Sequence, residues 1–169
     1  ERVPSSKAGS RTGKNDRALS RQSTTSSVPI SEVPMDGAKR LPTGVEEMDR
    51  VLGGGPVAGG VVLLAGDPGI GKSTLLVQIL AALTQQGHRT LYVTGEESPA
   101  QVAMRARRLD SPAIDRVGVL ATTELIDVEE CIRSEAPDVV VIDSIQTMRS
   151  PDLESAAGSV GQLREVTAR

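Results

Sequence analysis

Apolar positions along this chain fall into short continuous runs and longer helical stripes, and the two alternate. Residues 61–65 form a continuous apolar run, which predicts a strand buried on both faces of a parallel sheet. Over residues 72–86 apolar side chains recur at helical spacing, and Gly87 stands where helices commonly end in the left-handed conformation. This part of the chain therefore predicts a buried strand that leads into a helix.

The same order of elements continues through the second half of the chain. Residues 90–94, 117–120 and 139–142 are further apolar runs and predict three more strands. After the first of these runs, Ser98 and Gln101 flank a proline in the pattern of a capping box, which predicts the start of a helix. This alternation is typical of an α/β fold with a mostly parallel sheet flanked by helices.

The ordered core is predicted to span residues 41–169. Near its start, Thr43 is a candidate N-cap for a short helix over residues 45–52, which the glycines at 53–55 end. Residues 1–40 are left as a separate tail.

Helix signals also mark the far end of this core. A helix begins near Glu124 and stops before Pro137. Ser159 and Gln162 offer a second capping box, and the helix that they open runs to the last residue. Because four strands make a small sheet and the last helix ends in mid-pattern, we expect a core truncated at its C-terminus.

Charge is distributed unevenly between the predicted tail and the core. The chain has a net charge of −3, but residues 2–27 hold six basic residues and one acidic residue, which gives +5 there and −8 elsewhere. This segment is rich in Ser and Thr and cannot bury enough apolar surface to offset its chain entropy. We therefore predict a disordered tail or linker over residues 1–40. Its charge suits contact with nucleic-acid phosphates, and a solvated linker is the alternative.

Composition narrows the classes of function. With one tyrosine and no tryptophan or phenylalanine, the chain is unlike modules that stack bases on aromatic side chains. The single cysteine, Cys131, excludes an internal disulfide. The longest apolar run, near residues 75–83, is too short to cross a bilayer, and there is no signal-peptide pattern. We expect a cytoplasmic protein with no membrane partner.

One segment matches the phosphate-binding loop pattern G-x-x-x-x-G-K-[ST], and it follows the first predicted strand and opens the first long helix. Glycines allow the backbone N–H groups to point at phosphate oxygens, and the helix adds the positive end of its dipole. Lys72 is expected to reach the β- and γ-phosphates, Ser73 to ligate Mg²⁺, and Thr74 to donate to the α-phosphate. The pattern predicts ATP and Mg²⁺ as cofactors, bound by Gly66, Asp67, Pro68, Gly69, Ile70, Gly71, Lys72, Ser73 and Thr74.

Acidic residues follow two of the other predicted strands. Asp143 ends the run at 139–142, where a Walker B aspartate orients the Mg²⁺ shell with Ser73. Hydrolysis also needs a group that polarises the attacking water, and Glu96 and Glu97 follow the run at 90–94. If that strand lies next to the phosphate-loop strand, its end faces the γ-phosphate. One of the two glutamates is expected to serve, and the alternative is that both are solvated loop acids.

Basic residues cluster on the helix that begins after Ser98. Arg105, Arg107 and Arg108 could contact DNA or the nucleotide of a neighbouring subunit. The alternative is an exposed, solvated helix face.

Several segments together resemble the RecA-like ATPases and, among them, the bacterial RadA (Sms) family of DNA-repair and recombination ATPases. The resemblance covers about residues 41–169. Its segments are the lead-in at 41–55, the loop at 66–74, Tyr-Val-Thr-Gly-Glu-Glu-Ser at 92–98 and Val-Ile-Asp-Ser-Ile-Gln at 141–146. In RecA-like enzymes the catalytic glutamate ends the strand after the phosphate-loop helix, so the resemblance selects Glu96 over Glu97.

The resemblance implies a hexameric ring that binds single-stranded DNA and uses ATP to drive branch migration of recombination intermediates. The four-cysteine zinc motif of that family is absent from this sequence. The parts that couple ATP to DNA and assemble the ring would lie beyond Arg169, so we expect this chain to bind nucleotide and to hydrolyse it weakly.

Two other functions remain open from the sequence. One is a nucleotide-dependent assembly or signalling ATPase of the clock-protein type, without DNA motor activity, since paired glutamates suit that class too. The other is a small-molecule kinase, for which no acceptor pocket or arginine-rich lid is identifiable. Stimulation of turnover by single-stranded DNA would favour the DNA motor over the clock type.

Overall fold

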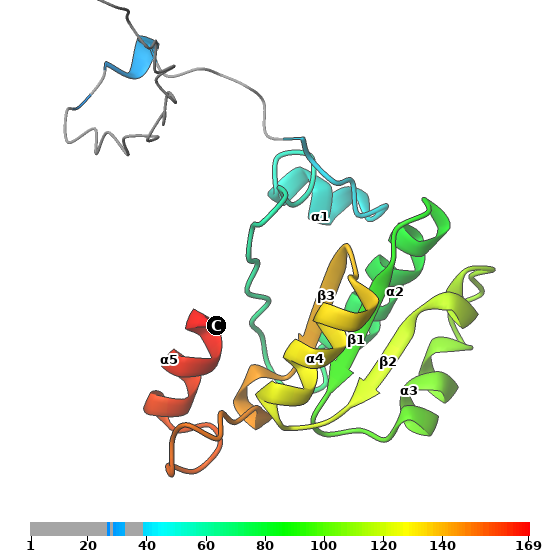
Figure 1. The fold of residues 1–169 in the computed structure, drawn as a ribbon. Helices are drawn as coiled ribbons and strands as arrows, with labels where there is room; N and C mark the ends of the chain where they lie inside the picture. The colour runs from blue at the N-terminus through cyan, green and yellow to red at the C-terminus, as the bar shows by residue number, and fades with distance from the viewer. Residues whose placement is uncertain (1–26, 28, 33–38) are drawn as a thin grey trace, which may run out of the picture. The chain divides into compact units, whose positions relative to one another are not determined.

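The computed structural model describes residue 27 and residues 29–32 and 39–169 (Figure 1). Most of the tail predicted over residues 1–40 therefore lies outside the described residues. Apart from the short 3-10 helix η1 (Ile30–Glu32), the described elements belong to one compact unit, Ala38–Arg169.

The described sheet is parallel, as predicted, and has three strands: β1 (Thr90–Thr94), β2 (Gly118–Ala121) and β3 (Val139–Asp143). Their order is β2-β1-β3, so β1 is central and is buried at all of its positions. The chain leaves β1 through α3 (Pro99–Ala106) to reach β2, and leaves β2 through α4 (Leu125–Glu135) to reach β3. The register pairs Thr94 with Asp143, which places the carboxyl ends of β1 and β3 side by side.

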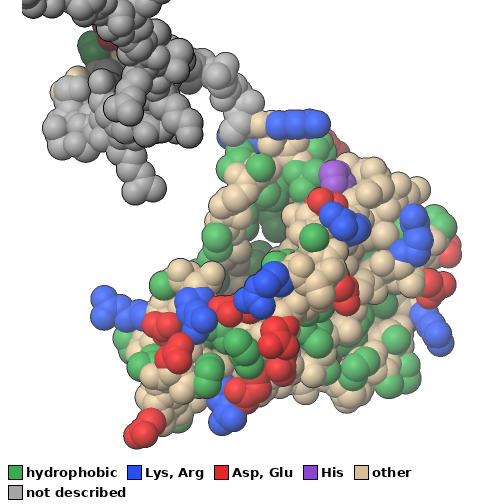
Figure 2. Space-filling model, viewed as in Figure 1, with side chains coloured by type: hydrophobic (Ala, Val, Ile, Leu, Met, Phe, Trp, Pro, Cys, Tyr) green, Lys and Arg blue, Asp and Glu red, His purple; other side chains and the backbone are tan. Residues whose placement is uncertain are grey.

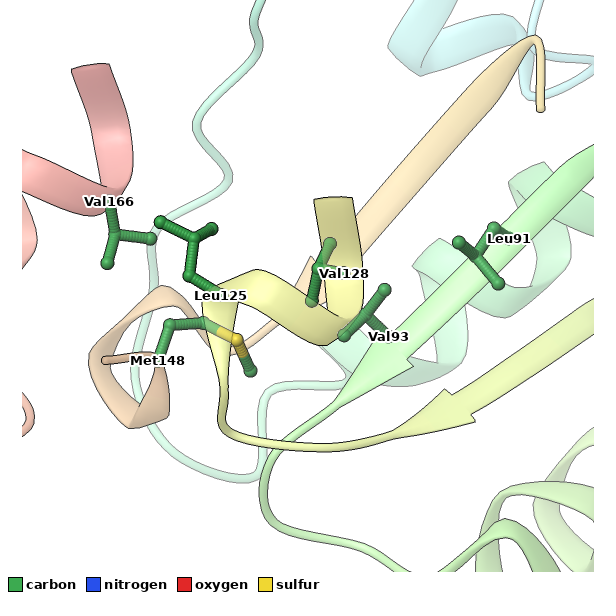
Figure 3. Packing of buried hydrophobic residues seen from close by; sticks show 6 residues of the cluster. All are labelled: Leu91, Val93, Leu125, Val128, Met148 and Val166. Carbon is green, nitrogen blue, oxygen red and sulfur yellow. The ribbon is translucent and has the colours of Figure 1, made fainter. Parts of the chain in front are cut away.

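Helices cover both faces of the sheet (Figure 1). On one face, α2 (Lys72–Gln85) and α3 pack against β1 through a cluster made of Val77, Leu80, Tyr92, Val102 and Ala106. On the other face lie α4, the 3-10 helix η3 (Ile145–Thr147) and α5 (Val160–Ala168). Figure 3 shows the second cluster, a row of buried side chains that extends from β1 past α4 to α5 and comprises Leu91, Val93, Leu125, Val128, Met148 and Val166. Alternation along β1 sends neighbouring side chains to opposite faces, so one strand supports both clusters.

The prediction of a strand over residues 61–65 is wrong. The segment lies outside the three-stranded sheet, and Val61 and Leu63 are 89% and 81% exposed. A strand exists only where a neighbour supplies hydrogen-bond partners, and in the described part of the chain no strand pairs with this one. Its apolar composition favours a strand, but composition cannot replace the hydrogen bonds that a neighbouring strand would provide.

Two predicted helix caps differ in the structure. The short helix α1 (Glu46–Val51) forms as expected, but its N-cap is Val45 and not Thr43. The Thr43 hydroxyl oxygen accepts from Val45 N at 3.2 Å, before the helix begins, and the Thr43 backbone N–H donates to Asp49 Oδ1 at 2.7 Å. Ser159 does cap α5 by accepting from Gln162 N. The Gln162 side chain does not complete the capping box, since it is buried and donates to the carbonyls of Ser150, Leu153 and Ser155.

The capping box at α3 is confirmed in both directions. The Ser98 hydroxyl accepts from Gln101 N at 3.3 Å, and Gln101 Oε1 accepts from Ser98 N at 2.8 Å. The cap fixes the point at which the chain turns into α3, directly after Glu96 and Glu97. Local signals thus place this helix next to the candidate site.

Candidate nucleotide-binding and hydrolysis site

The predicted phosphate-binding residues form one exposed loop that ends in the first turn of α2. Gly69 and Gly71 have φ values of 78° and 101°, a left-handed conformation that glycine adopts without strain. Gly71 is the N-cap of α2, and the first turn of this 14-residue helix has no acidic residue. The positive end of the helix dipole therefore faces the loop without a competing side-chain charge, which suits an anionic ligand.

Lys72 lies across this loop. Its Nζ donates to Gly66 O at 2.7 Å and to Asp67 O at 2.8 Å, so the ammonium group is held by the loop's own carbonyls. Ser73 and Thr74 follow in the half-buried first turn of α2. The structure thus brings together the loop residues that the sequence pattern singled out.

A second part of the site lies at the carboxyl ends of β1 and β3. Gly95 N donates to Asp143 O at 3.2 Å and continues the contact between the two strands. A Cβ atom at Gly95 would lie 2.0 Å from Thr147 Oγ1, so only glycine fits this close approach. The Thr94 hydroxyl accepts from the backbone N–H groups of Glu96 and Glu97 at 3.3 and 3.0 Å. Both glutamates are therefore held in one tight turn.

The two glutamates have different surroundings. Glu96 is exposed, and its Oε1 accepts a hydrogen bond from Ser144 Oγ at 3.0 Å. Glu97 is half-buried and forms an ion pair with Arg105, whose Nη1 lies 2.7 Å from the carboxylate. Since Ser144 directly follows Asp143, Glu96 contacts the segment that carries the candidate Walker B residue.

Sequence reasoning missed Tyr92, which connects these parts. Its side chain is fully buried, and its hydroxyl donates to Asp143 Oδ2 and accepts from Arg105 Nη2 at 3.0 Å. Burial raises the pKa of the phenol far above its ordinary value, and the hydrogen bond to Asp143 and its negative charge raise it further. The positive charge of Arg105 lowers this pKa in part.

Tyr92 can be identified as a site residue only when the register between β1 and β3 is known. β1 pairs Tyr92 with Val141, so Asp143 stands two residues further along β3, on the same face of the sheet. The sequence supplied both strands but not their adjacency.

Ser73 and Asp143 form a donor set that fits Mg²⁺. Hydroxyl and carboxylate oxygens are ligands for hard cations, and Mg²⁺ is commonly held by one or two protein groups together with waters and substrate phosphates. Among the described residues, no group of three or more His, Cys, Asp or Glu side chains could hold a metal by itself. Ser73 and Asp143 would therefore leave the other coordination positions of such an ion to waters and phosphate oxygens.

The three arginines of the predicted basic cluster have different surroundings. The interpretation as an exposed basic face is wrong for Arg105, which is half-buried and bonded to Glu97 and Tyr92. Arg107 and Arg108 follow α3 and are exposed. On the face that carries α4, Figure 2 shows acidic and basic side chains interspersed, and here Glu124 and Glu129 pair with Arg149 and Arg169 at 2.7 and 3.0 Å.

The parallel α/β sheet and the phosphate-binding loop define a P-loop ATPase domain of the RecA-like class. A family model described as "ATPase: KaiC" matches residues 41–119. The similarity to bacterial RadA that the sequence motifs indicated is confirmed by curated relatives from several organisms.

The chain is 51% identical over 140 residues to the DNA repair protein RadA of Listeria monocytogenes. It is 52% identical over 139 residues to the protein of that name in Pseudomonas aeruginosa, and 49% identical over 139 residues to the one in Escherichia coli. These alignments cover 82–83% of this chain. The chain spans 30% of the length of these relatives.

None of the described helices is both long and apolar enough to cross a membrane.

Proposed function

We propose that this chain binds ATP with Mg²⁺ and hydrolyses it as the ATPase part of a DNA-repair protein. The observation that carries the proposal is the contact between its two halves. Tyr92 packs with Val77 and Leu80 of α2, the helix that begins at the phosphate-binding loop, and its hydroxyl donates to Asp143 at the end of β3. One buried side chain thus links the helix behind the loop to the candidate Walker B carboxylate, which supports a single nucleotide site.

Each predicted site residue has a role in this proposal. Backbone N–H groups of the loop and the N-terminus of α2 bind the phosphates, and Lys72 pairs with the terminal phosphates. Ser73 and Asp143 would hold Mg²⁺, which when bound neutralises charge on the phosphate oxygens. Thr74 donates to the α-phosphate. The phosphate-binding set is Gly66, Asp67, Pro68, Gly69, Ile70, Gly71, Lys72, Ser73 and Thr74.

Glu96 is the proposed general base that accepts a proton from the attacking water. Its carboxylate is exposed and bonded to Ser144, next to Asp143, whereas the Glu97 carboxylate is paired with Arg105. A carboxylate whose oxygen atoms are engaged by a guanidinium group is less available to an attacking water molecule. These surroundings support Glu96 over Glu97.

The DNA part of the proposal rests on the relatives that are named DNA repair proteins. We propose that single-stranded DNA stimulates turnover and that the whole protein acts on recombination intermediates by branch migration, as a hexameric ring in the cytoplasm. This chain spans 30% of the length of the relatives. We therefore propose the ring and the DNA contacts for the whole protein.

The test is nucleotide binding and ATP turnover by the chain and by Lys72→Ala, each with and without single-stranded DNA. We expect Lys72→Ala to weaken Mg-ATP binding by about 100-fold, because the variant loses the charge-assisted contacts of the ammonium group to the β- and γ-phosphates. Lys39→Ala is the matched control, since Lys39 is an exposed lysine outside the site. Equal binding by wild type and Lys72→Ala would contradict the proposal.

A second candidate function is a nucleotide-dependent assembly ATPase of the clock-protein type, which the match to the KaiC model favours. In such a protein ATP holds subunits together, and turnover is slow. The same experiment separates the two. DNA-stimulated turnover supports the repair motor, whereas ATP-dependent association without any response to DNA supports the assembly ATPase.

A further inference from the structure

Tyr92 forms a polar contact where the core would otherwise be apolar. Its ring belongs to the cluster with Val77, Leu80, Val102 and Ala106, between β1 and the helices α2 and α3. Only its hydroxyl departs from that apolar character, and this hydroxyl donates to Asp143 Oδ2. A phenylalanine would fill the same space, so packing alone does not account for the oxygen atom.

Arg105 completes this arrangement from α3. One arm of its guanidinium group, Nη2, donates to the Tyr92 hydroxyl at 3.0 Å, and the other, Nη1, donates to Glu97 Oε1 at 2.7 Å. The guanidinium carbon also lies 5.8 Å from the centre of the tyrosine ring, within the range of a cation–π contact. A planar, forked guanidinium group presents two nitrogen donors in a fixed geometry, here one to each partner.

We propose that Tyr92 and Arg105 are positioning residues: the Tyr92 phenol fixes the Asp143 carboxylate for Mg-nucleotide, and Arg105 fixes the phenol while it holds Glu97 away from the reaction. This inference rests on the proposed function and extends it to two residues that do not touch the nucleotide. Hydrogen bonds of this kind orient metal-ligating groups in proteins, and their loss typically weakens metal binding by 10–100-fold.

The arrangement also explains why one of two adjacent glutamates is selected. Glu96 and Glu97 lie in the same turn and are both bonded through their N–H groups to Thr94. Arg105 pairs with Glu97 alone. Arg105 therefore separates the roles of the two acids as well as supporting Tyr92.

The chain offers a direct spectroscopic probe of these contacts. Because it has one tyrosine and no tryptophan, its intrinsic ultraviolet emission comes from Tyr92 alone. A phenol that donates to a carboxylate is quenched. We expect Asp143→Asn to increase this emission in the nucleotide-free chain, Arg105→Met to change it, and Arg107→Met, on the exposed side of the same region, to leave it unchanged.

The second measurement is the Mg²⁺ dependence of ADP affinity, by titration calorimetry on the 169-residue chain. We expect Tyr92→Phe and Arg105→Met each to reduce the enhancement of ADP binding by Mg²⁺ about 10-fold, with ADP affinity in EDTA unchanged. The double variant should lose no more than the larger single loss, because both residues act through Asp143. Thermal unfolding without ligand identifies a variant that fails to fold, and Arg105→Met then supplies both measurements with Tyr92 retained.

The outcomes distinguish this inference from the function on which it rests. If wild type binds Mg-ADP and Tyr92→Phe or Arg105→Met keeps the wild-type Mg²⁺ enhancement, the positioning role is overturned while the ATPase proposal stands. Unchanged emission in both Asp143→Asn and Arg105→Met would also overturn it. If wild type binds no nucleotide, the proposed function fails and the positioning role fails with it.

Discussion

Residues 61–65 and 90–94 are both short apolar runs that lead into the candidate site, and they have opposite fates in the structure. The second run is β1, the central strand, buried at every position and paired on both sides. The first lies outside the described sheet, with Val61 and Leu63 exposed. Residues 61–65 are in fact the more uniformly apolar of the two runs, since residues 90–94 begin and end with threonine. The difference shows that a strand depends on which neighbours supply hydrogen bonds, and not on its own composition.

The largest expected effect is a difference in the free energy of unfolding between substitutions in the two runs. Leu91→Ala should lower the free energy of unfolding by about 2–5 kcal/mol, because Leu91 is buried between β1 and its covering helices. Leu63→Ala is the matched control and should change it by less than about 0.5 kcal/mol, since this leucine is exposed. Urea unfolding of the two variants measures both values. A cost at Leu63 as large as at Leu91 would show that residues 61–65 are buried after all.

The next effect concerns the residues that follow β1. Glu96→Gln should reduce ATP turnover by about 100-fold, the lower end of the usual contribution of general acid–base catalysis, while leaving nucleotide affinity unchanged. Glu97→Gln is the control and should lower turnover less, because its carboxylate is already paired with Arg105. Single-turnover kinetics with each variant make the comparison. A greater loss in Glu97→Gln would reverse the assignment of the base.

The smallest effect concerns the segment before residues 61–65. The backbone N–H of Thr43 donates to the Asp49 carboxylate and, as the largest cause, lowers the pKa of Asp49 below its ordinary value of 3.8. A depressed pKa contributes stability above the ordinary pKa and loses it as pH falls through the folded pKa. Because solvent screens this carboxylate, Asp49→Asn should destabilise the chain by about 0.5 kcal/mol or less at neutral pH and have no effect below that pKa. Thermal unfolding at several pH values measures this, and an effect that persists in strong acid would contradict it.

Much of the fold and the candidate site follows from local patterns. Residues 66–74 form a loop that leads into α2, because the glycines and the start of the helix lie within one short segment of sequence. The α3 capping box likewise depends on residues only three positions apart. The correction at Gln162 has the opposite origin, because its side chain donates to the carbonyls of Ser150, Leu153 and Ser155 and does not close the capping box.

The sequence alone determined the parallel α/β class, the ends of β1 and α2 and the chemistry of the phosphate-binding loop, since each rests on periodicity or on contacts between near neighbours. The tertiary structure decided which strands are adjacent. It thereby placed Tyr92 against Asp143, paired Arg105 with Glu97 and left residues 61–65 outside the sheet. The physical reason is that register, burial and ion pairing are properties of two segments at once. No pattern within one segment contains them.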